Sequence, residues 1–159
     1  MENGKTISLE NFIKSAKGKT LVGLDLGEKT IGVAVCDESW LIASPLQTVV
    51  RRAFATDMDA LKKLLGQRDV GGFVSGLPVE MNGEEGDRAR ATRLYAERIA
   101  AHFDSPLIFQ DERLSSKAVE RFMIDEGDFS RKKRKKLIDN SAAAYILQGF
   151  IDKIGFLRI

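Results

Sequence analysis

Three β-rich segments follow one another between residues 20 and 50, with only short links between them. They run from Leu21 to Leu26, from Thr30 to Cys36 and from Leu41 to Val50. The links Gly27–Lys29 and Asp37–Ser39 contain residue types that are typical of turns. Because links this short join neighbouring antiparallel strands, this part of the chain predicts an antiparallel meander.

After the meander, the pattern alternates between helix and strand. Apolar residues at helical spacing predict helices, and short apolar runs bounded by turn residues predict strands. We expect helices over Thr56–Leu65, Glu84–His102, Ser116–Ile124 and about Lys136–Ile151, and strands over Val70–Leu77 and Pro106–Gln110. Thr56 and Asp59 are spaced like a capping box. The predicted fold class is α/β, with three antiparallel strands and then two α-linked strands in a mixed five-stranded sheet with flanking helices, which is the ribonuclease-H-like layout.

The size and composition of the chain favour one soluble domain. A chain of 159 residues is long enough for a single core, which we place over residues 20–159, after a flexible N-terminal extension over residues 1–19. The extension lacks the apolar stretch of a secretory signal, and no apolar run approaches the ~20 residues that span a bilayer. The single cysteine, Cys36, cannot form an intramolecular disulfide and suits a reducing compartment. We therefore expect a cytoplasmic protein with no membrane segment.

Asp25 stands within an apolar strand, where its neighbours Leu24 and Leu26 occupy the opposite face. A carboxylate there is costly unless a cation or hydrogen-bond donors accompany it. The alternative is that Asp25 forms a turn at the strand end by bonding to the backbone of Gly27.

Three further acidic residues lie where a site could form. Asp111 and Glu112 directly follow a predicted strand, at the carboxyl edge where ligands gather in sheets with parallel strands, although a solvated loop also carries such acids. Asp139 shares a side of the last predicted helix with Ala143 and Ile146, and that side should face the core. An aspartate near a helix start is also stabilised by the helix dipole without any other role.

Separate carboxylates that meet at one edge of a sheet repel one another unless a cation neutralises them. The acids therefore predict a metal site, and an all-oxygen ligand set suits Mg²⁺ or Mn²⁺. Zinc is disfavoured because the chain has one histidine, His102, and one cysteine. We expect His102 to lie at a helix C-terminus without a catalytic role.

Six consecutive cations precede the last predicted helix. They are Arg131, Lys132, Lys133, Arg134, Lys135 and Lys136. The net charge of +2 does not by itself indicate a nucleic-acid partner, and a charge run is often only a solvated surface. Because this run lies just ahead of Asp139, we expect it to bind backbone phosphates beside the metal site.

Taken in order, five motifs resemble the YqgF/RuvX family of Holliday-junction-resolvase-like nucleases, which is associated with maturation of the small-subunit ribosomal RNA precursor. The resemblance spans about residues 19–152. The motifs are Gly23–Gly27, Thr30–Val35, Gly76–Pro78 with Asn82–Gly83, Asp111–Ser116, and Asp139 with Ala142–Ala143. Five motifs in one order are far more specific than any one of them.

The resemblance implies that Asp25, Glu112 and Asp139 are catalytic acids that bind Mg²⁺ or Mn²⁺, and that residues 76–86 form a loop at the edge of the active site. It implies metal-dependent phosphodiester hydrolysis in structured nucleic acid, as in 5′-end maturation of the 16S rRNA precursor. We expect Arg113, Ser115 and Ser116 to bind the nucleic acid together with the basic run. The chain departs from the family pattern at Thr30, where many members have Arg, and at Ser115 and Ser116, where paired Thr is frequent.

Several alternatives stay open on the sequence. The substrate is precursor rRNA or branched DNA, so the rival activity is a Holliday-junction-type DNA resolvase, and a non-catalytic RNA-binding module would retain the same acids. A sugar-kinase-like or actin-like ATPase uses a phosphate motif similar to Asp25–Gly27, but it needs a second lobe to enclose ATP. A four-way junction cutter usually needs two active sites, so a homodimer remains an alternative to a monomer.

Overall fold

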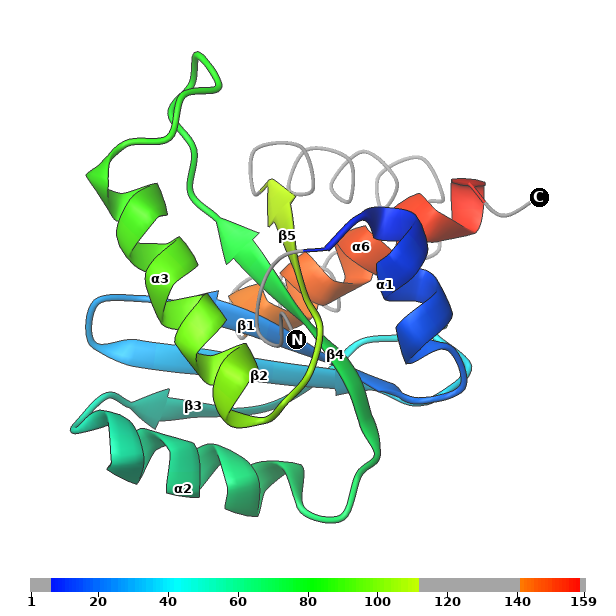
Figure 1. Cartoon of the computed structure of the whole chain (residues 1–159), viewed down its shortest axis with the longest axis horizontal. Coiled ribbons are helices and arrows are strands. Elements are labelled where there is room, and N and C mark those ends of the chain that lie inside the picture. Colours follow the sequence, from blue (N-terminus) through cyan, green and yellow to red (C-terminus); the bar gives the residue numbers. More distant parts are fainter. Residues whose placement is uncertain (1–6, 112–140, 158–159) are drawn as a thin grey trace, which may run out of the picture.

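The computed structural model describes residues 7–111 and 141–157, and a five-stranded sheet lies at its centre (Figure 1). The strands are β1 (Thr20–Leu26), β2 (Thr30–Cys36), β3 (Ser44–Val50), β4 (Val70–Leu77) and β5 (Leu107–Asp111). Their order is β3-β2-β1-β4-β5. The pairs β1–β2 and β2–β3 are antiparallel, whereas β1–β4 and β4–β5 are parallel. The predicted mixed sheet is confirmed.

The described helices cover both faces of this sheet (Figure 1). They are α1 (Leu9–Ala16), α2 (Phe54–Leu65), α3 (Asp87–His102) and α6 (Ala142–Leu157). Along β1, Leu21 packs in a core with α1 and α6, and Val22 and Leu24 pack in a second core with α2 and α3. The two-residue period of a strand thus divides the apolar side chains between two layers. Within the described ranges, no helix combines the length and apolar character needed to cross a membrane.

Helix α1 was not predicted from the sequence, since residues 1–19 were interpreted as an extension. Ser8 caps the helix by accepting a hydrogen bond from the backbone N–H of Asn11 at 3.2 Å. Phe12 and Ala16 are fully buried, and the Phe12 ring meets the Phe150 ring edge to face at 5.6 Å between centroids. The apolar residues Leu9, Phe12, Ile13 and Ala16 recur at helical spacing, so the sequence does carry the signal for this helix. Residues 9–16 therefore contribute to the core.

Strand β3 begins at Ser44 rather than at Leu41. Trp40 has a positive φ of 52°, and its indole N–H donates to the carbonyl of Lys19 at 2.7 Å. The chain turns there, so Leu41 and Ile42 precede the strand and are 67% and 71% exposed. An apolar run predicts a strand, but this run lies in the connection.

The predicted capping box at the start of α2 is wrong. The helix begins at Phe54, its N-cap residue is Ala53, and no side chain caps it. Thr56 and Asp59 lie inside the helix. The buried acid of this helix is instead Asp57, whose carboxylate accepts hydrogen bonds from the Arg52 backbone N–H at 2.8 Å and from the Tyr95 hydroxyl at 2.9 Å.

The other boundaries differ by a few residues. Helix α3 begins at Asp87, three residues later than predicted, and β5 is Leu107–Asp111. Helix α6 begins at Ala142, because Ser141 precedes it in non-helical conformation, and it extends to Leu157 instead of ending at 151. The helix predicted over residues 116–124 lies outside the described residues.

Cys36 is buried in the core. Burial raises the pKa of this thiol to about 11, against a weaker opposing effect of a hydrogen bond with the Leu21 backbone. The thiol stays protonated at neutral pH and acts as a small apolar side chain.

Helix α6 lies against β1 at Gly23. A Cβ atom at Gly23 would lie 2.7 Å from Cβ of Leu147 and 2.8 Å from the carbonyl oxygen of Ala143. Both contacts are too short for any side chain, so only glycine permits this approach. The contact fixes the first turns of α6 over the strand that carries Asp25.

We therefore predict that Gly23→Ala displaces α6 and lowers the free energy of unfolding by about 1–3 kcal/mol or more, the range of overpacking in a core. Urea denaturation measures this change. Gly155→Ala is the matched control within α6, since a Cβ there meets no atom within 4 Å. It should be neutral or stabilise by up to about 1 kcal/mol. Equal effects of the two variants would contradict the close-packing account.

Candidate metal and nucleic-acid site

Asp25 lies near the carboxyl end of β1 and faces α6. Strand alternation puts its side chain on the same face as Leu21 and Gly23, away from the α2 and α3 layer. Its partner on β2 is Gly32, where a Cβ atom would lie 3.4 Å from Cβ of Asp25 and 3.6 Å from Cβ of Ala143. The glycine therefore leaves open the space beside the carboxylate.

The start of α6 borders the same space. The Ser141 hydroxyl accepts a hydrogen bond from the backbone N–H of Ala144 at 2.9 Å, and the Ser141 carbonyl accepts one from Tyr145 at 3.1 Å. These bonds are those of an N-cap residue. The positive end of the helix dipole thus lies beside Asp25, where it favours negative charge.

Asp25 and the start of α6 line one open pocket with a volume of about 350 Å³. Polar side chains contribute much of its lining. They are Asp25, Thr30, Gln47, Thr48 and Ser141. Their carboxylate, hydroxyl and amide oxygens are hard donors of the kind that Mg²⁺ and Mn²⁺ prefer.

The soft ligands of the described chain lie elsewhere. Cys36 pairs with Leu21 at the other end of β1, and His102 ends α3 on the opposite sheet face. The residues around Asp25 therefore fit a hard divalent cation. In the described part of the chain, no three acidic, histidine or cysteine side chains are grouped closely enough to hold an ion, and two of the three acids predicted as ligands lie outside that part.

The Asp25 carboxyl has a perturbed pKa. Burial raises the pKa above its ordinary value of 3.8, and the positive charge of Arg88 on α3 partly opposes this rise. An ionised Asp25 is therefore costly in the free protein, and a bound cation would relieve that cost.

The sheet register places the ends of β4 and β5 beside Asp25. Leu24 pairs with Ser75 and Gly76 pairs with Gln110, so Asp25, Gly76 and Gln110 follow one another across neighbouring strands. The Gln110 side chain accepts a hydrogen bond from Lys153 of α6 at 3.0 Å, which shows that it faces the α6 layer, as Asp25 does. Asp111, one residue later, is on the opposite face.

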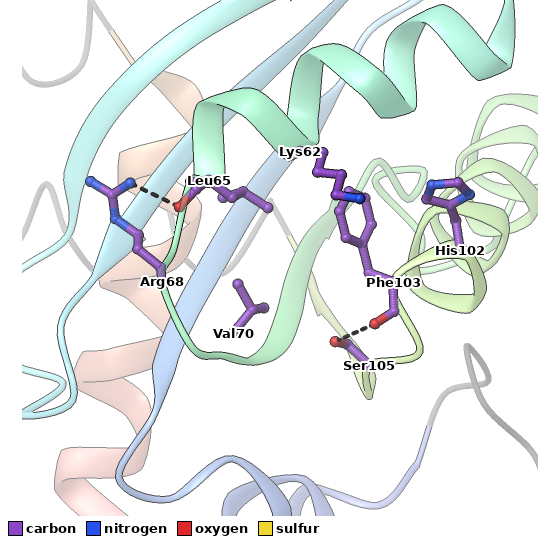
Figure 2. Close-up of a pocket in the computed structure, with 8 residues that line it drawn as sticks. Lys62, Leu65, Arg68, Val70, His102, Phe103 and Ser105 are labelled. Carbon is purple, nitrogen blue, oxygen red and sulfur yellow. Dashed lines mark hydrogen bonds between the residues drawn. The ribbon is translucent and has the colours of Figure 1, made fainter.

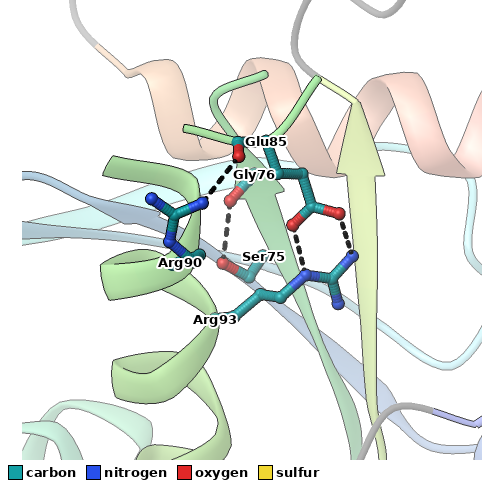
Figure 3. A network of polar contacts seen from close by, with 5 residues as sticks. All are labelled: Ser75, Gly76, Glu85, Arg90 and Arg93. Atoms are coloured by element: carbon teal, nitrogen blue, oxygen red, sulfur yellow. Dashed lines mark hydrogen bonds and ion pairs between the residues drawn. The ribbon is translucent and has the colours of Figure 1, made fainter. Parts of the chain in front are cut away.

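The loop between β4 and α3 is held at this carboxyl edge of the sheet. Figure 3 shows the Glu85 carboxylate bound by the Arg93 guanidinium through two hydrogen bonds of 2.5 and 3.0 Å, and the Glu85 carbonyl bound by Arg90 at 3.0 Å. The hydrogen bond from Arg93 lowers the pKa of Glu85. Arg93 also lies over the Phe109 ring at 4.7 Å, and the Ser75 hydroxyl donates to the carbonyl of Gly76. These contacts tie the loop that was predicted to border the active site to α3 and β5.

A different pocket, with a volume of about 390 Å³, lies at the opposite edge of the sheet (Figure 2). Arg68 donates to the carbonyls of Leu64 and Leu65 at 3.3 and 3.1 Å. Its guanidinium thus provides hydrogen bonds for carbonyls in the last turn of α2. His102 is the last residue of α3, which confirms its predicted position. The basic residues of this pocket thus lie where helices end.

Of the predicted site residues, the structure describes Asp25 alone. The others lie outside the described residues: Glu112, Arg113, Ser115, Ser116, Asp139 and the basic run Arg131–Lys136. The predicted core side of the last helix is borne out by Ala143, Ile146 and Phe150, all of which are buried.

Two arginines at the carboxyl end of β1, Arg51 and Arg88, were not predicted from the sequence. Arg51 donates to the carbonyl of Gly27 at 2.7 Å and lies over the Tyr95 ring at 3.9 Å. The neighbouring Arg52 is exposed, and its backbone N–H donates to the carboxylate of Asp57. Arg51 and Arg52 are adjacent after β3, and nothing in the sequence indicates which of the two side chains faces the protein.

We predict that Asp25→Asn raises the melting temperature of the metal-free protein near neutral pH. Because the folded-state pKa is raised, the native state holds the proton more tightly than the unfolded state, so wild-type stability falls as pH rises from 3.8 through the raised pKa. Removing the charge should therefore stabilise the protein by a few degrees at about pH 7.5 and have little effect at about pH 4.

Asp37→Asn is the control for this prediction, because Asp37 is an exposed carboxylate whose pKa is lowered by hydrogen bonds from Ser39. That variant should not be stabilised near neutral pH. Melting curves in EDTA measure both variants, and a destabilised Asp25→Asn would contradict the cost assigned to the Asp25 charge.

Comparison with known proteins places the chain in a family. It matches the RuvX family, described as Holliday junction resolvase, over residues 19–153. A protein of Rhodospirillum rubrum named "Putative pre-16S rRNA nuclease" is 45% identical over 148 residues, covering 92% of each chain. A protein of Rhodobacter capsulatus with the same name is 50% identical over 137 residues, covering 86% of each chain.

A solved structure, T. thermophilus RuvC in complex with Holliday junction substrate, has a TM-score of 0.50 and 13% identity, and the match covers 86% of this chain and 96% of that one. This likeness concerns the fold, and it agrees with the ribonuclease-H-like architecture predicted from the order of the elements. Since the family match and the relatives extend over most of the sequence, the chain belongs to the RuvX family.

Proposed function

We propose that this chain is a metal-dependent nuclease that hydrolyses phosphodiester bonds in the precursor of 16S rRNA. Family membership and the names of the relatives support the substrate and the reaction class. The single structural observation that carries the proposal is Asp25, a carboxylate with a raised pKa in a polar pocket at the start of α6. We place the protein in the cytoplasm, which suits its unpaired Cys36.

Asp25, Glu112 and Asp139 are the proposed ligands of Mg²⁺ or Mn²⁺. When bound, the cation lowers the pKa of the attacking water and stabilises the leaving oxygen. In hydrolysis, the water oxygen bonds to phosphorus while the bond from phosphorus to the leaving sugar oxygen breaks. The start of α6, with its backbone N–H groups and Ser141, lies where a phosphate oxygen of the substrate would be bound.

The face of β5 favours Glu112 over Asp111 as the partner of Asp25. Gln110 faces the α6 layer, as Asp25 does, and Asp111 faces the other layer. The two-residue period of a strand would return the next side chain to the α6 layer. Glu112 is therefore the proposed ligand, and Asp111 is assigned to ordering the end of β5.

A second candidate function is resolution of DNA four-way junctions, which the description of the family favours. A homodimer would present the two active sites that junction cutting usually needs. To separate the candidates, purified protein is incubated with precursor rRNA, a DNA four-way junction and single-stranded RNA, each with and without Mn²⁺. The proposal expects Mn²⁺-dependent cleavage of the precursor. Preferred cutting of the junction would favour the resolvase, and binding without any cleavage would favour an RNA-binding module.

We predict that Glu112→Gln and Asp139→Asn each lower the rate of precursor cleavage by more than about 100-fold. Mutation of residues that only hydrogen-bond to metal ligands already lowers metal affinity or activity by about 10–100-fold, and loss of a ligand should cost more. Asp111→Asn is the adjacent control, and it should lower the rate by less than about tenfold. Single-turnover cleavage with saturating Mn²⁺ measures all three. An inactive Asp111→Asn beside an active Glu112→Gln would show that the wrong neighbour was assigned.

The basic run generates a separate prediction about binding. Four lysines, Lys132, Lys133, Lys135 and Lys136, are replaced by Gln. RNA binding should weaken for all sequences, because contacts with backbone phosphates are lost. The dependence of log K on log salt should also flatten, since each lost phosphate contact removes about 0.7–0.9 from its slope. Titrations of RNA at several salt concentrations give this slope. An unchanged slope would leave the run as surface charge with no role in binding.

A further inference from the structure

A second pocket at the carboxyl end of β1 lies on the opposite side of the sheet from the Asp25 pocket. Its volume is about 410 Å³, and it lies between the β1–β2 turn and the first half of α3. Leu26 and Gly27, the two residues after Asp25, form part of its wall. A strand of nucleic acid that crosses this end of β1 with one phosphate at Asp25 would therefore pass this pocket with another.

Arg51 is held in place at this pocket before any ligand binds. Its guanidinium donates to the carbonyl of Gly27 at 2.7 Å and lies over the Tyr95 ring, 3.9 Å from the ring centroid. The Tyr95 hydroxyl is bound in turn to the buried carboxylate of Asp57 at 2.9 Å. A guanidinium has five N–H donors, more than these contacts use, so a fixed group remains able to bind an anion.

Thr92 provides the observation that points to a ligand. It is 6% exposed and lines the pocket, yet its hydroxyl has no hydrogen-bond partner among the residues that the structure describes. Buried hydroxyl groups are nearly always paired, because an unpaired one loses its hydrogen bonds to water without replacement. A ligand in the pocket with an acceptor oxygen would satisfy it.

The charge around the pocket favours an anion. Arg51 and Arg88 both line it, and of its two acids, Asp87 is engaged in an ion pair with Arg90. The other acid, Glu28, lies exposed on the β1–β2 turn. Helix α3 begins here with Gly86 as its N-cap residue and no side-chain cap, so its first N–H groups also face this end.

We propose that this pocket is a subsite for a backbone phosphate of the nucleic-acid substrate, bound by Arg51, Arg88 and the Thr92 hydroxyl next to the phosphodiester at Asp25. This inference rests on the proposed nuclease function, which it deepens by assigning a second point of contact on the strand. The subsite would fix the position of the strand relative to Asp25 from the opposite side of the sheet to α6.

The test measures binding without cleavage, so that it does not depend on nuclease activity. The probe is a fluorescein-labelled stem–loop RNA with a single-stranded 5′ extension, titrated in EDTA and followed by anisotropy at several salt concentrations. Arg88→Gln should weaken binding and lower the salt slope by about 0.7–0.9, the value of one phosphate contact. Arg98→Gln is the matched control, an exposed arginine further along α3 that lies over the Phe54 ring. It should leave affinity and slope unchanged.

Thr92→Val separates a binding role from a structural one. Valine keeps the shape and removes the unpaired hydroxyl, so the free protein should melt at the same or a higher temperature while RNA affinity falls by roughly 3–10-fold, the loss of one hydrogen bond. Thr92→Ser, which retains the hydroxyl, should bind more tightly than Thr92→Val.

The proposal requires both Arg88→Gln and Thr92→Val to weaken binding. Wild-type affinity in either variant, or an equal loss in Arg98→Gln, overturns it. Failure of the wild type to cleave RNA with Mn²⁺ would overturn the proposed function instead, and it would be visible in a separate assay.

Discussion

The close contact of α6 with β1 at Gly23 is the constraint on which the arrangement of the candidate site depends. Because no side chain stands at Gly23, the backbone of α6 reaches the strand, and Ala143 and Leu147 occupy the space of the missing Cβ. The start of the helix and its cap, Ser141, then lie beside Asp25. A larger residue at position 23 would separate the helix dipole from the carboxylate.

The topology of the sheet determines which residues lie on either side of Asp25. An antiparallel hairpin puts Gly32 next to Asp25, and the parallel strands β4 and β5 end at the same edge, in the row Asp25, Gly76, Gln110. Gly32 leaves room beside the carboxylate on the β2 side. The structure therefore combines a costly charge, open space and hard oxygen donors, a set of features that suits a divalent cation.

Much of the fold could be predicted from the sequence because hydrophobic period and turn residues are local signals. The succession of strands and helices along the chain follows from these signals, and so does the division of the β1 side chains between two layers. Helix α1 carries the same local signal, because its apolar residues recur at helical spacing, although the partner that buries Phe12, Phe150, is distant in the chain. The start of β3 could not be predicted in this way, since the turn at Trp40 depends on the carbonyl of Lys19. Asp25 was predictable as a charge out of place in an apolar strand. The proposed roles of Arg51 and Thr92 were not predictable, because they depend on contacts with residues that are far away in the chain.

We propose above that Asp25 belongs to a site that binds a divalent cation. Isothermal titration of the purified, metal-free protein with Mn²⁺ tests it most directly, with Asp25→Asn compared against the wild type and against Asp37→Asn as a variant of equal charge. We expect saturable Mn²⁺ binding that is retained in Asp37→Asn and weakened at least about tenfold in Asp25→Asn. Equal Mn²⁺ affinity in all three proteins would contradict it.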